Sequence, residues 1–416
     1  MAVGAYPAMN KPYSRAGLLK AGLLSLSVWS AGLISNPALA QCNWPAWQQF
    51  KQAYISEQGR VIDASDSRHI TTSEGQSYGL FFALVANDQA AFAQLLDWTE
   101  ANLAAGDLSA RLPAWLWGKK PDSKNPEGDN QPQEWGVLDT NSASDSDLWL
   151  AYDLLEAGRL WQDRRYQVLG TLLLQRIARE EVVDMAGLGV MLLPGKVGFV
   201  NNDESGAQAS WTLNPSYLPP QLLARFARLQ GPWRKLQANY PRLLSGAAPH
   251  GLVADWVVWH STKGWQPAPK AERDAANSQA PLVADYDGSY DAIRSYLWVG
   301  MLAKDAPQRK MLLAQLQPMA ALTAELGLPP EQINSRTGKS DGTGPLGFSA
   351  ALLPLLAQTT QAASLDAQVA RLNQAPFDEH AYYDTVLRLF GEGWHQGRYR
   401  FNGVGELQLG EQTCQK

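Results

Sequence analysis

The sequence is poor in the residues that bind transition metals. It has only two cysteines, Cys42 and Cys414, and five histidines among 416 residues. Two cysteines cannot form a zinc site alone, and the histidines lack the close spacing of a ligand pair. The sequence therefore predicts a protein that works without a metal, and no other cofactor is expected.

Positive charge is also scarce. The formal net charge is −5, and no run of lysines and arginines appears. A nucleic-acid-binding surface needs a basic patch, so nucleic acid is excluded as a partner. The chain is rich instead in tryptophan, with 16 residues. Exposed indole rings commonly stack on sugar rings or bases, which leaves carbohydrate as the expected ligand.

A long apolar run of the kind that spans a membrane is missing as well. The longest candidate, residues 21–34, is too short, but it follows Lys11, Arg15 and Lys20 and precedes the small-residue segment 38–40. This order is typical of an export signal cleaved after residue 40. We therefore expect a periplasmic or secreted protein with no stable membrane insertion after signal removal.

Export bears on the two cysteines, which stand near the two ends of the mature chain. In an oxidising compartment Cys42 and Cys414 can form a disulfide. Closing so long a loop contributes on the order of 5 kcal/mol in the chain-entropy model. The sequence thus allows a covalent tie between the termini and leaves open whether it forms.

No low-complexity linker interrupts residues 41–416, which predicts one domain. Its apolar periodicity is mostly helical, and the expected helices arrive in pairs with an apolar first member and an amphipathic second. Inner helices alternating with outer ones describe an all-α helical toroid. The expected helices span residues 44–58, 75–87, 89–104, 144–158, 162–183, 216–229, 231–245, 289–302, 307–325, 346–357, 360–373 and 377–391.

The remaining segments are irregular or strand-like. Residues 121–134 and 267–287 are polar and are expected to be surface loops. Short strands are expected within residues 189–199, 252–259 and 399–409, the last around an Asn-Gly turn.

Three acidic segments stand at the starts of three apolar helices. They contain Glu74, Asp145 and Asp291, each more than 70 residues from the next. If the inner helices point the same way, their N-termini meet at one rim and the three carboxylates face one another. A pair of carboxylates, one protonated and one ionised, is what hydrolysis of a glycosidic bond requires.

Each acid also has a purely structural interpretation. Glu74 follows Ser73, a good helix-start residue, and a first-turn glutamate suits the helix dipole. Asp145 could cap its helix, and Asp291 could pair with Arg294 one turn later. The three structural interpretations are much less probable jointly than singly.

Five segments resemble glycoside hydrolase family 8. They are residues 73–79 (SEGQSYG), 143–147 (ASDSD), 289–294 (SYDAIR), 112–119 (LPAWLWGK) and 214–220 (NPSYLPP). The similarity covers essentially the whole mature chain and is strongest to family members associated with bacterial cellulose synthesis.

The resemblance implies an (α/α)6 barrel, with short β pieces at one rim, that hydrolyses β-1,4-glucan with inversion. By position, Glu74 is the proton donor and Asp291 the base that activates water, while Asp145 holds and distorts the sugar. It also implies a role in trimming glucan during cellulose synthesis, with the synthase and export complex as a partner.

The same resemblance implies a set of substrate-contacting residues. Tyr217, Tyr290 and Arg294 are expected to position Asp291 and its water, while Trp115 and Trp117 are expected to stack on glucose rings.

Three positions depart from the family pattern, which favours Gly or Ala where this chain has Ser146 and other residues where it has Leu150 and Asp153. Only Ser146 is expected to bear on the rate. The added hydroxyl is expected to alter how closely a sugar approaches, and hence the rate.

Two other functions compete with glucan hydrolysis. Residues 75–79 fit G-x-S-x-G, the nucleophile motif of α/β-hydrolases, but the alternating strand–helix pattern of that fold is missing. A glucan-binding protein that guides a polymer without cutting it needs the tryptophans but not Glu74 and Asp291. Within the family's range, mixed-linkage glucan, xylan and chitosan stay open as substrates.

Overall fold

The structure is a computed structural model that describes residues 44–121, 133–202, 209–269 and 284–410. Contacts group residues Ala40–Lys416 into one compact unit, which is the unit described below. Cys42, Cys414 and the predicted export signal lie outside the described residues.

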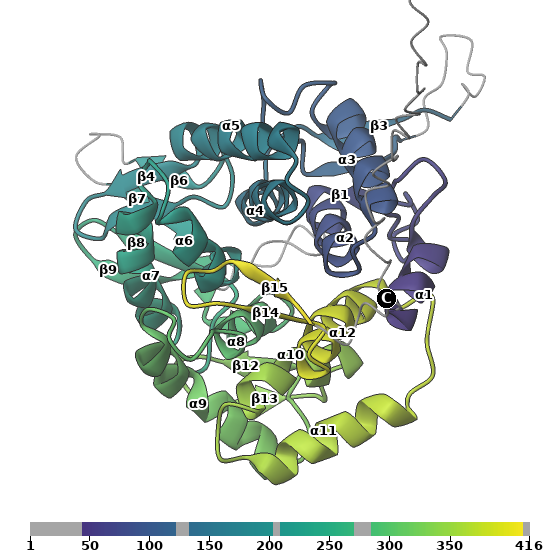
Figure 1. Cartoon of the computed structure of the whole chain (residues 1–416). Helices are drawn as coiled ribbons and strands as arrows, with labels where there is room; N and C mark the ends of the chain where they lie inside the picture. The colour runs from purple at the N-terminus through teal and green to yellow at the C-terminus, as the bar shows by residue number, and fades with distance from the viewer. Residues whose placement is uncertain (1–43, 122–132, 203–208, 270–283, 411–416) are drawn as a thin grey trace, which may run out of the picture. The chain divides into compact units, whose positions relative to one another are not determined.

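Among the described residues, six helices form an inner ring, whose arrangement is drawn in Figure 1. Each contacts the next in the order of the chain, from α2 to α12, and Phe82 of the first packs on Phe390 of the last with ring centroids 4.7 Å apart. These contacts close the ring. The inner helices are α2 (Ser73–Val85), α4 (Ser144–Leu160), α6 (Pro220–Phe226), α8 (Ala292–Gly300), α10 (Leu346–Leu356) and α12 (Tyr382–His395).

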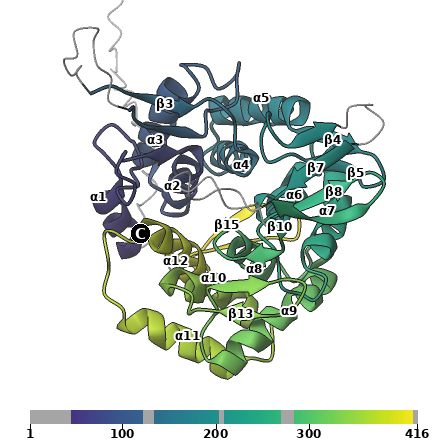
Figure 2. The same ribbon diagram turned by 180° about the vertical axis from the view of Figure 1, so that it is seen from behind.

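Six further helices form an outer ring, each paired with one inner helix. The view from behind shows the same two rings (Figure 2). The outer helices are α1 (Pro45–Tyr54), α3 (Gln89–Leu103), α5 (Arg164–Glu180), α7 (Trp233–Ala247), α9 (Arg309–Leu326) and α11 (Ala362–Gln374). Within the described ranges, twelve helices in two concentric rings make the (α/α)6 barrel that the family resemblance implies.

The apolar patterns explain which helices lie inside. In α2 every residue except Glu74 is buried, and in α10 all residues after Leu346 are buried. The outer helix α5 buries only one stripe, in which Leu169, Leu173 and Ile177 are spaced four residues apart. A helix that is apolar all round needs neighbours on every side, and only the inner ring supplies them.

The predicted helix positions are confirmed, with ends that differ by a few residues. The largest difference falls on residues 377–391, where α12 begins only at Tyr382 and ends at His395. Within residues 216–229, a 3₁₀ turn (Pro215–Tyr217) precedes the shorter helix α6. Prolines 219 and 220 separate the two pieces, because the residue before a proline disfavours helical backbone. None of the helices in the described ranges is long and apolar enough to cross a membrane.

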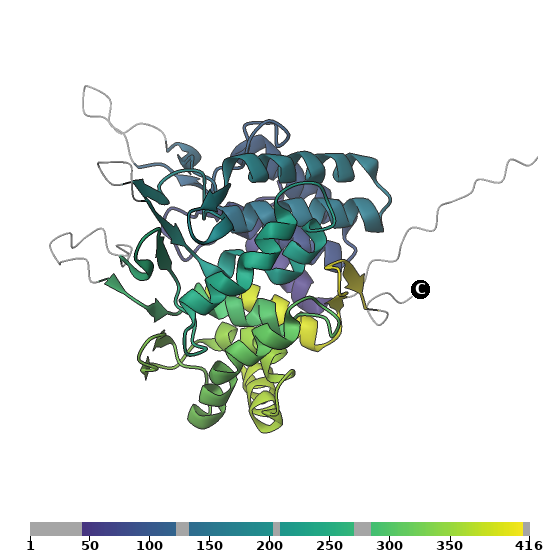
Figure 3. The same ribbon diagram turned by 90° about the vertical axis from the view of Figure 1, so that its left-hand side faces the viewer.

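Short antiparallel strands connect the helices, and most of them lie on one side of the helical rings (Figure 3). Two larger sheets matter for the site. One contains β1 (Thr71–Thr72), β2 (Leu116–Lys119) and β3 (Trp135–Asp139). The other has the order β10-β9-β8-β7-β6, from β6 (Val200–Asn202), β7 (Ala209–Leu213), β8 (Val257–His260), β9 (Gly264–Pro269) and β10 (Ala284–Asp285).

Three smaller sheets complete the connections. They are formed by β4 (Val182–Met185) with β5 (Gly189–Leu192), by β11 (Asp287–Gly288), β12 (Gln332–Asn334) and β13 (Ser340–Asp341), and by β14 (Tyr399–Phe401) with β15 (Leu407–Leu409). The predicted strands within 189–199, 252–259 and 399–409 are confirmed. The expectation of a loop throughout 267–287 is wrong at both ends, where β9, β10 and β11 pair with neighbours. Most of the other expected loop, residues 122–132, lies outside the described residues.

Candidate active site

Glu74 lies in the first turn of α2, and its side chain is 27% exposed. The N-cap of this helix is Thr72, whose hydroxyl accepts from the backbone N–H of Gly75 at 3.0 Å, and Ser73 is the first helical residue. Ser73 thus starts the helix as the sequence predicts, while the capping side chain is that of Thr72. Thr72 fixes the entry of the chain and so the direction in which Glu74 leaves the helix.

Asp145 is the second residue of α4, and its side chain is only 3% exposed. The helix begins after Ala143 without a side-chain cap, so the interpretation of Asp145 as a cap is wrong. Burial raises the pKa of the Asp145 carboxyl to about 7, while the backbone N–H of Ser146, 2.7 Å from Oδ1, opposes the rise. A carboxyl group buried this deeply needs a hydrogen-bond or ion-pair partner close to it.

Asp291 occupies the N-cap position of α8, and its side chain is 23% exposed. Asp255 secures this helix start, because its Oδ1 accepts from the backbone N–H groups of residues 289, 291 and 292 at 2.7–3.1 Å. The indole N–H of Trp256 donates to Asp291 Oδ2 at 3.0 Å. Neighbouring residues of one segment thus hold the backbone and the carboxylate of Asp291.

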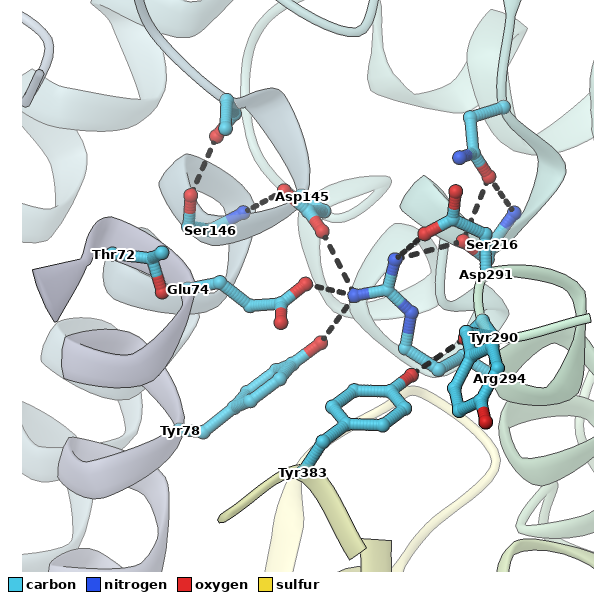
Figure 4. Close-up of polar contacts among 12 residues, drawn as sticks. Thr72, Glu74, Tyr78, Asp145, Ser146, Ser216, Tyr290, Asp291, Arg294 and Tyr383 are labelled. Carbon is cyan, nitrogen blue, oxygen red and sulfur yellow. Dashed lines mark hydrogen bonds and ion pairs between the residues drawn. The ribbon is translucent and has the colours of Figure 1, made fainter. Parts of the chain in front are cut away.

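Arg294 joins the three carboxylates (Figure 4). Its side chain is 3% exposed, and Nη1 contacts Oε2 of Glu74 and, at 3.3 Å, Oδ2 of Asp145. Its other terminal nitrogen, Nη2, lies 2.9 Å from Oδ1 of Asp291. Nη1 also donates to the hydroxyl of Tyr78 at 3.2 Å. The structure therefore brings together the three acids that the sequence singles out, although Arg294 serves all three rather than Asp291 alone.

The segment 214–217 also contacts the guanidinium of Arg294. Nη2 donates to Ser216 Oγ at 3.3 Å, and this hydroxyl donates in turn to Asn214 Oδ1 at 2.7 Å. The guanidinium carbon lies 5.6 Å from the centre of the Tyr217 ring. A planar guanidinium suits such a place, because it donates in several fixed directions and packs on aromatic rings.

One cation among three carboxylates leaves an excess of negative charge in a largely buried place. Burial disfavours the charged form of Arg294 and lowers its pKa from the usual value. The arrangement favours a retained proton on one of the acids, since like charges at short range cannot all ionise. Among these acids, burial raises the pKa of Asp145 to about 7.

Ser146 does not lie where a sugar would meet it. The residue is fully buried, and its hydroxyl lies 2.6 Å from Ser73 Oγ and 2.8 Å from the carbonyl of Ala143. The expectation that this hydroxyl alters the approach of a sugar is therefore wrong. Ser146 instead links the first turn of α4 to the first turn of α2, next to Asp145 and Glu74.

Tyr290 and Trp115 lie beside the site. The hydroxyl of Tyr290 donates to Glu331 at 2.9 Å, and its backbone carbonyl accepts from the hydroxyl of Tyr383 at 2.6 Å. Trp115 is half-buried, and its carbonyl accepts from Ser73 N at 3.0 Å, one residue before Glu74. Both residues thus lie near the acids, as expected from the sequence segments that contain them.

Trp117 belongs to a cluster that continues away from Glu74 along the β1–β2–β3 sheet. In this sheet Thr72 pairs with Leu116, Thr71 with Trp117, and Lys119 with Trp135. The Trp117 and Trp135 rings stack with centroids 5.7 Å apart and planes 24° apart, and Trp135 is 44% exposed. The guanidinium of Arg60 lies 4.3 Å from the Trp117 ring and 5.1 Å from the Trp135 ring.

Several site residues are absent from the sequence-based expectations. They are Tyr78, Trp135, Ser216, Asp255 and Trp256. Ser216 lies within a segment that carries the family resemblance, and Trp256 shares the aromatic character that marks sugar sites. No local signal identifies Asp255, because a side-chain cap is usually sought within a few residues of the helix start and this one lies 36 residues before Asp291.

Comparison with known proteins agrees with the fold and with the segments at the site. The model of glycosyl hydrolases family 8 matches residues 22–397. The endoglucanase of Escherichia coli O157:H7 is 51% identical over 390 residues, which cover 94% of this chain and 96% of that protein. The endoglucanase of Xanthomonas axonopodis pv. citri is 44% identical, with coverage of 95% and 96%.

Solved structures show the same relationship. The endo-1,4-D-glucanase of Vibrio fischeri matches with a TM-score of 0.74 and 44% identity over 88% of this chain and 99% of that one. The endo-β-1,4-glucanase CMCax of Acetobacter xylinum matches with a TM-score of 0.62 and 25% identity, over 84% and 97% of the two chains. The chain thus belongs to glycosyl hydrolases family 8 and is a glycoside hydrolase.

Proposed function

We propose that the protein is an endo-β-1,4-glucanase that hydrolyses its substrate with inversion at the anomeric carbon. Glu74 is the general acid, Asp291 is the general base, and Asp145 holds the sugar at the point of cleavage. The observation that carries this proposal is the placement of two partly exposed carboxylates on the two different terminal nitrogens of one buried arginine, Arg294.

In the proposed reaction one proton moves on each side of the glycosidic bond. Glu74 gives its proton to the glycosidic oxygen as the bond to the anomeric carbon breaks. Water attacks that carbon from the opposite face and passes a proton to Asp291, so the base ends protonated and the acid ionised. Inverting pairs are typically about 6.5–9.5 Å apart to leave room for this water. A guanidinium between Glu74 and Asp291 is compatible with such a gap.

The contacts of each acid suit its proposed role. Asp291 accepts from the indole N–H of Trp256 and from Arg294, and both donors stabilise the ionised carboxylate that a base needs. Glu74 has one oxygen on Arg294, which leaves the other for the transferable proton. Asp145 is too deeply buried to attack the sugar carbon freely, and a bond to a sugar hydroxyl fits its position better.

The substrate is proposed from the relatives, which are named endoglucanases, and from the tryptophans near Glu74. A soluble cellulose derivative, xylan and chitosan should be compared by release of reducing ends and by fall in viscosity. We expect cleavage of the cellulose derivative, with viscosity falling early because internal bonds are cut. Preferred cleavage of xylan or chitosan would contradict the proposed substrate.

The rival proposal of a glucan-binding guide without catalysis predicts a different result. Such a protein would bind the cellulose derivative and release no reducing ends above background at any protein concentration. It would also have no use for two carboxylates on Arg294 that a solvent molecule can reach. The family membership and this geometry favour the enzyme.

Trp135 offers a further surface for the glucan chain, since its ring is exposed and continues the line from Glu74 through Trp117. We expect Trp135→Ala to raise KM on long glucan about five-fold, which corresponds to roughly 1 kcal/mol of lost stacking. Hydrolysis of short cello-oligosaccharides should change less. Phe377→Ala removes an aromatic residue that is 37% exposed and packs on Tyr54 of α1, and it should leave KM unchanged. Equal effects of the two variants would contradict the role of Trp135.

The cellular setting is proposed from the sequence. Residues 1–40 are an export signal, the catalytic domain spans residues 41–416, and the mature protein acts in the periplasm or outside the cell. There it trims glucan during cellulose synthesis, in contact with the synthase and export complex. Cleavage after residue 40, read by N-terminal sequencing of the exported protein, tests the first step of this account.

A further inference from the structure

Two carboxyl groups behind the site have no role in the proposed reaction. Asp147 lies in the first turn of α4, and Glu181 is the C-cap residue of α5; both are fully buried. Their side chains lie within hydrogen-bonding reach of each other. Within the described residues, neither oxygen of Asp147 nor Oε2 of Glu181 receives a hydrogen bond from any donor. Two ionised carboxylates in this arrangement would repel each other and leave three buried oxygens unsatisfied.

A single proton between the groups removes the repulsion and gives two of these three oxygens a partner, and the neighbouring donors show which group holds it. The backbone N–H of Lys196 donates to Ser142 Oγ at 3.1 Å, so the Ser142 hydroxyl directs its own hydrogen to Glu181 Oε1 at 2.5 Å. Glu181 therefore accepts from the Ser142 side. This hydrogen bond stabilises the ionised form of Glu181, whereas no donor among the described residues stabilises an ionised Asp147, so the proton between the two carboxyl groups lies on Asp147, which donates to Glu181.

We propose that Asp147 and Glu181 share one proton held by Asp147, and that this pair keeps negative charge off Asp147 and so allows Asp145 to ionise. Asp145 is two residues from Asp147 in the same helical turn. A charged Asp147 there would disfavour the ionised form of Asp145, which Arg294 contacts. Asp147 and Glu181 are thus positioning residues that act through Asp145.

The charges around the pair agree with this assignment. Burial raises the pKa of both carboxyl groups, and the negative charge of Glu181 raises that of Asp147 further. The other charged groups that face the pair are Asp145 and Glu180, which oppose ionisation, and Lys196, which favours it.

The first test is independent of catalysis. A folded-state pKa raised above the unfolded value contributes stability at low pH that is lost as the pH rises through the folded pKa. The melting temperature of the wild type should therefore fall as the pH rises from about 4, the ordinary pKa of these carboxyl groups, through about 8, the raised pKa of Glu181, and Asp147→Asn and Glu181→Gln should each reduce this fall. Because only one proton is shared, the double variant should reduce it no more than either single variant. Additive reductions would overturn the proposal.

The second test uses the pH dependence of kcat/KM and rests on the proposed function. In Glu181→Gln the amide donates to Asp147, which can then carry the charge next to Asp145. The low-pH limb of the kcat/KM profile should shift to higher pH by about one unit. Asp147→Asn should leave this limb in place, because Glu181 keeps the charge.

Asp153→Asn is the matched control, since Asp153 is another fully buried carboxyl of α4 whose oxygens lack donors among the described residues. It should leave the limb of the pH profile in place. A Glu181→Gln profile that coincides with the wild type would overturn the proposal. If Glu181→Gln does not fold, the melting curves of Asp147→Asn decide: a pH dependence equal to that of the wild type overturns the shared proton. An inactive wild type would overturn the proposed function and leave the melting-temperature test intact.

Discussion

Glu74→Gln should lower kcat on a soluble cellulose derivative by roughly 10²–10⁴-fold, the usual contribution of general acid catalysis. Glutamine keeps an oxygen for Arg294 Nη1 but has no proton to give to the leaving oxygen. The measurement is the initial rate of reducing-end release at saturating substrate. The melting temperature should stay close to that of the wild type, because the size and the contact of the side chain are preserved.

A substrate with a better leaving group provides a more specific test of the role of Glu74. An aryl glycoside of a short cello-oligosaccharide releases a phenolate that needs little protonation, so Glu74→Gln should lose much less activity on it. Glu325→Gln, at an exposed position of α9, is the control and should match the wild type on both substrates. Equal losses of Glu74→Gln on the two substrates would show that Glu74 is not the proton donor.

Asp291→Asn should also lower kcat by roughly 10²–10⁴-fold, while the affinity for a cello-oligosaccharide stays close to that of the wild type. Asparagine has nearly the same shape but cannot take a proton from the attacking water. Its oxygen can still accept from Arg294 Nη2 or from Trp256 Nε1. Initial rates measure the first quantity, and titration calorimetry with an unlabelled oligosaccharide measures the second.

The separation of binding from turnover identifies the role of Asp291. A loss of affinity that accounts for the whole loss of kcat/KM would mean that Asp291 binds the substrate rather than activates water. Activity close to the wild type would assign the base to another residue. Asp255→Asn is a useful companion variant, because Asp255 holds the start of α8 without contacting a proposed water, and its effect should appear mainly in stability.

The fold was largely predictable because its signals are local and repeated. Helices that are apolar all round, such as α2 and α10, alternate with striped helices such as α5, and this alternation alone indicates two concentric rings. The short strands were harder to predict. Strands of two residues, such as β1 and β11, are set by pairing with distant segments and leave no alternating pattern in the sequence.

The acids of the candidate site were predictable from the sequence, but the residues that hold them in place were not. Glu74, Asp145 and Asp291 each stand before an apolar helix, and a shared helix direction brings these positions to one rim. Ser216 and Asp255 act through contacts that span 78 and 36 residues, and no spacing rule connects them to their partners. Ser146 shows the same limit, because its departure from the family pattern is visible in the sequence but its bond to Ser73 is not.

The configuration of the first product tests the central claim most directly. The account requires water, activated by Asp291, to attack the anomeric carbon on the face opposite the bond that Glu74 protonates. NMR spectra recorded during the first minutes of cello-oligosaccharide hydrolysis, before mutarotation, should show the new reducing end as the α anomer. A β anomer would mean retention through a covalent intermediate and would contradict the roles assigned to both carboxylates.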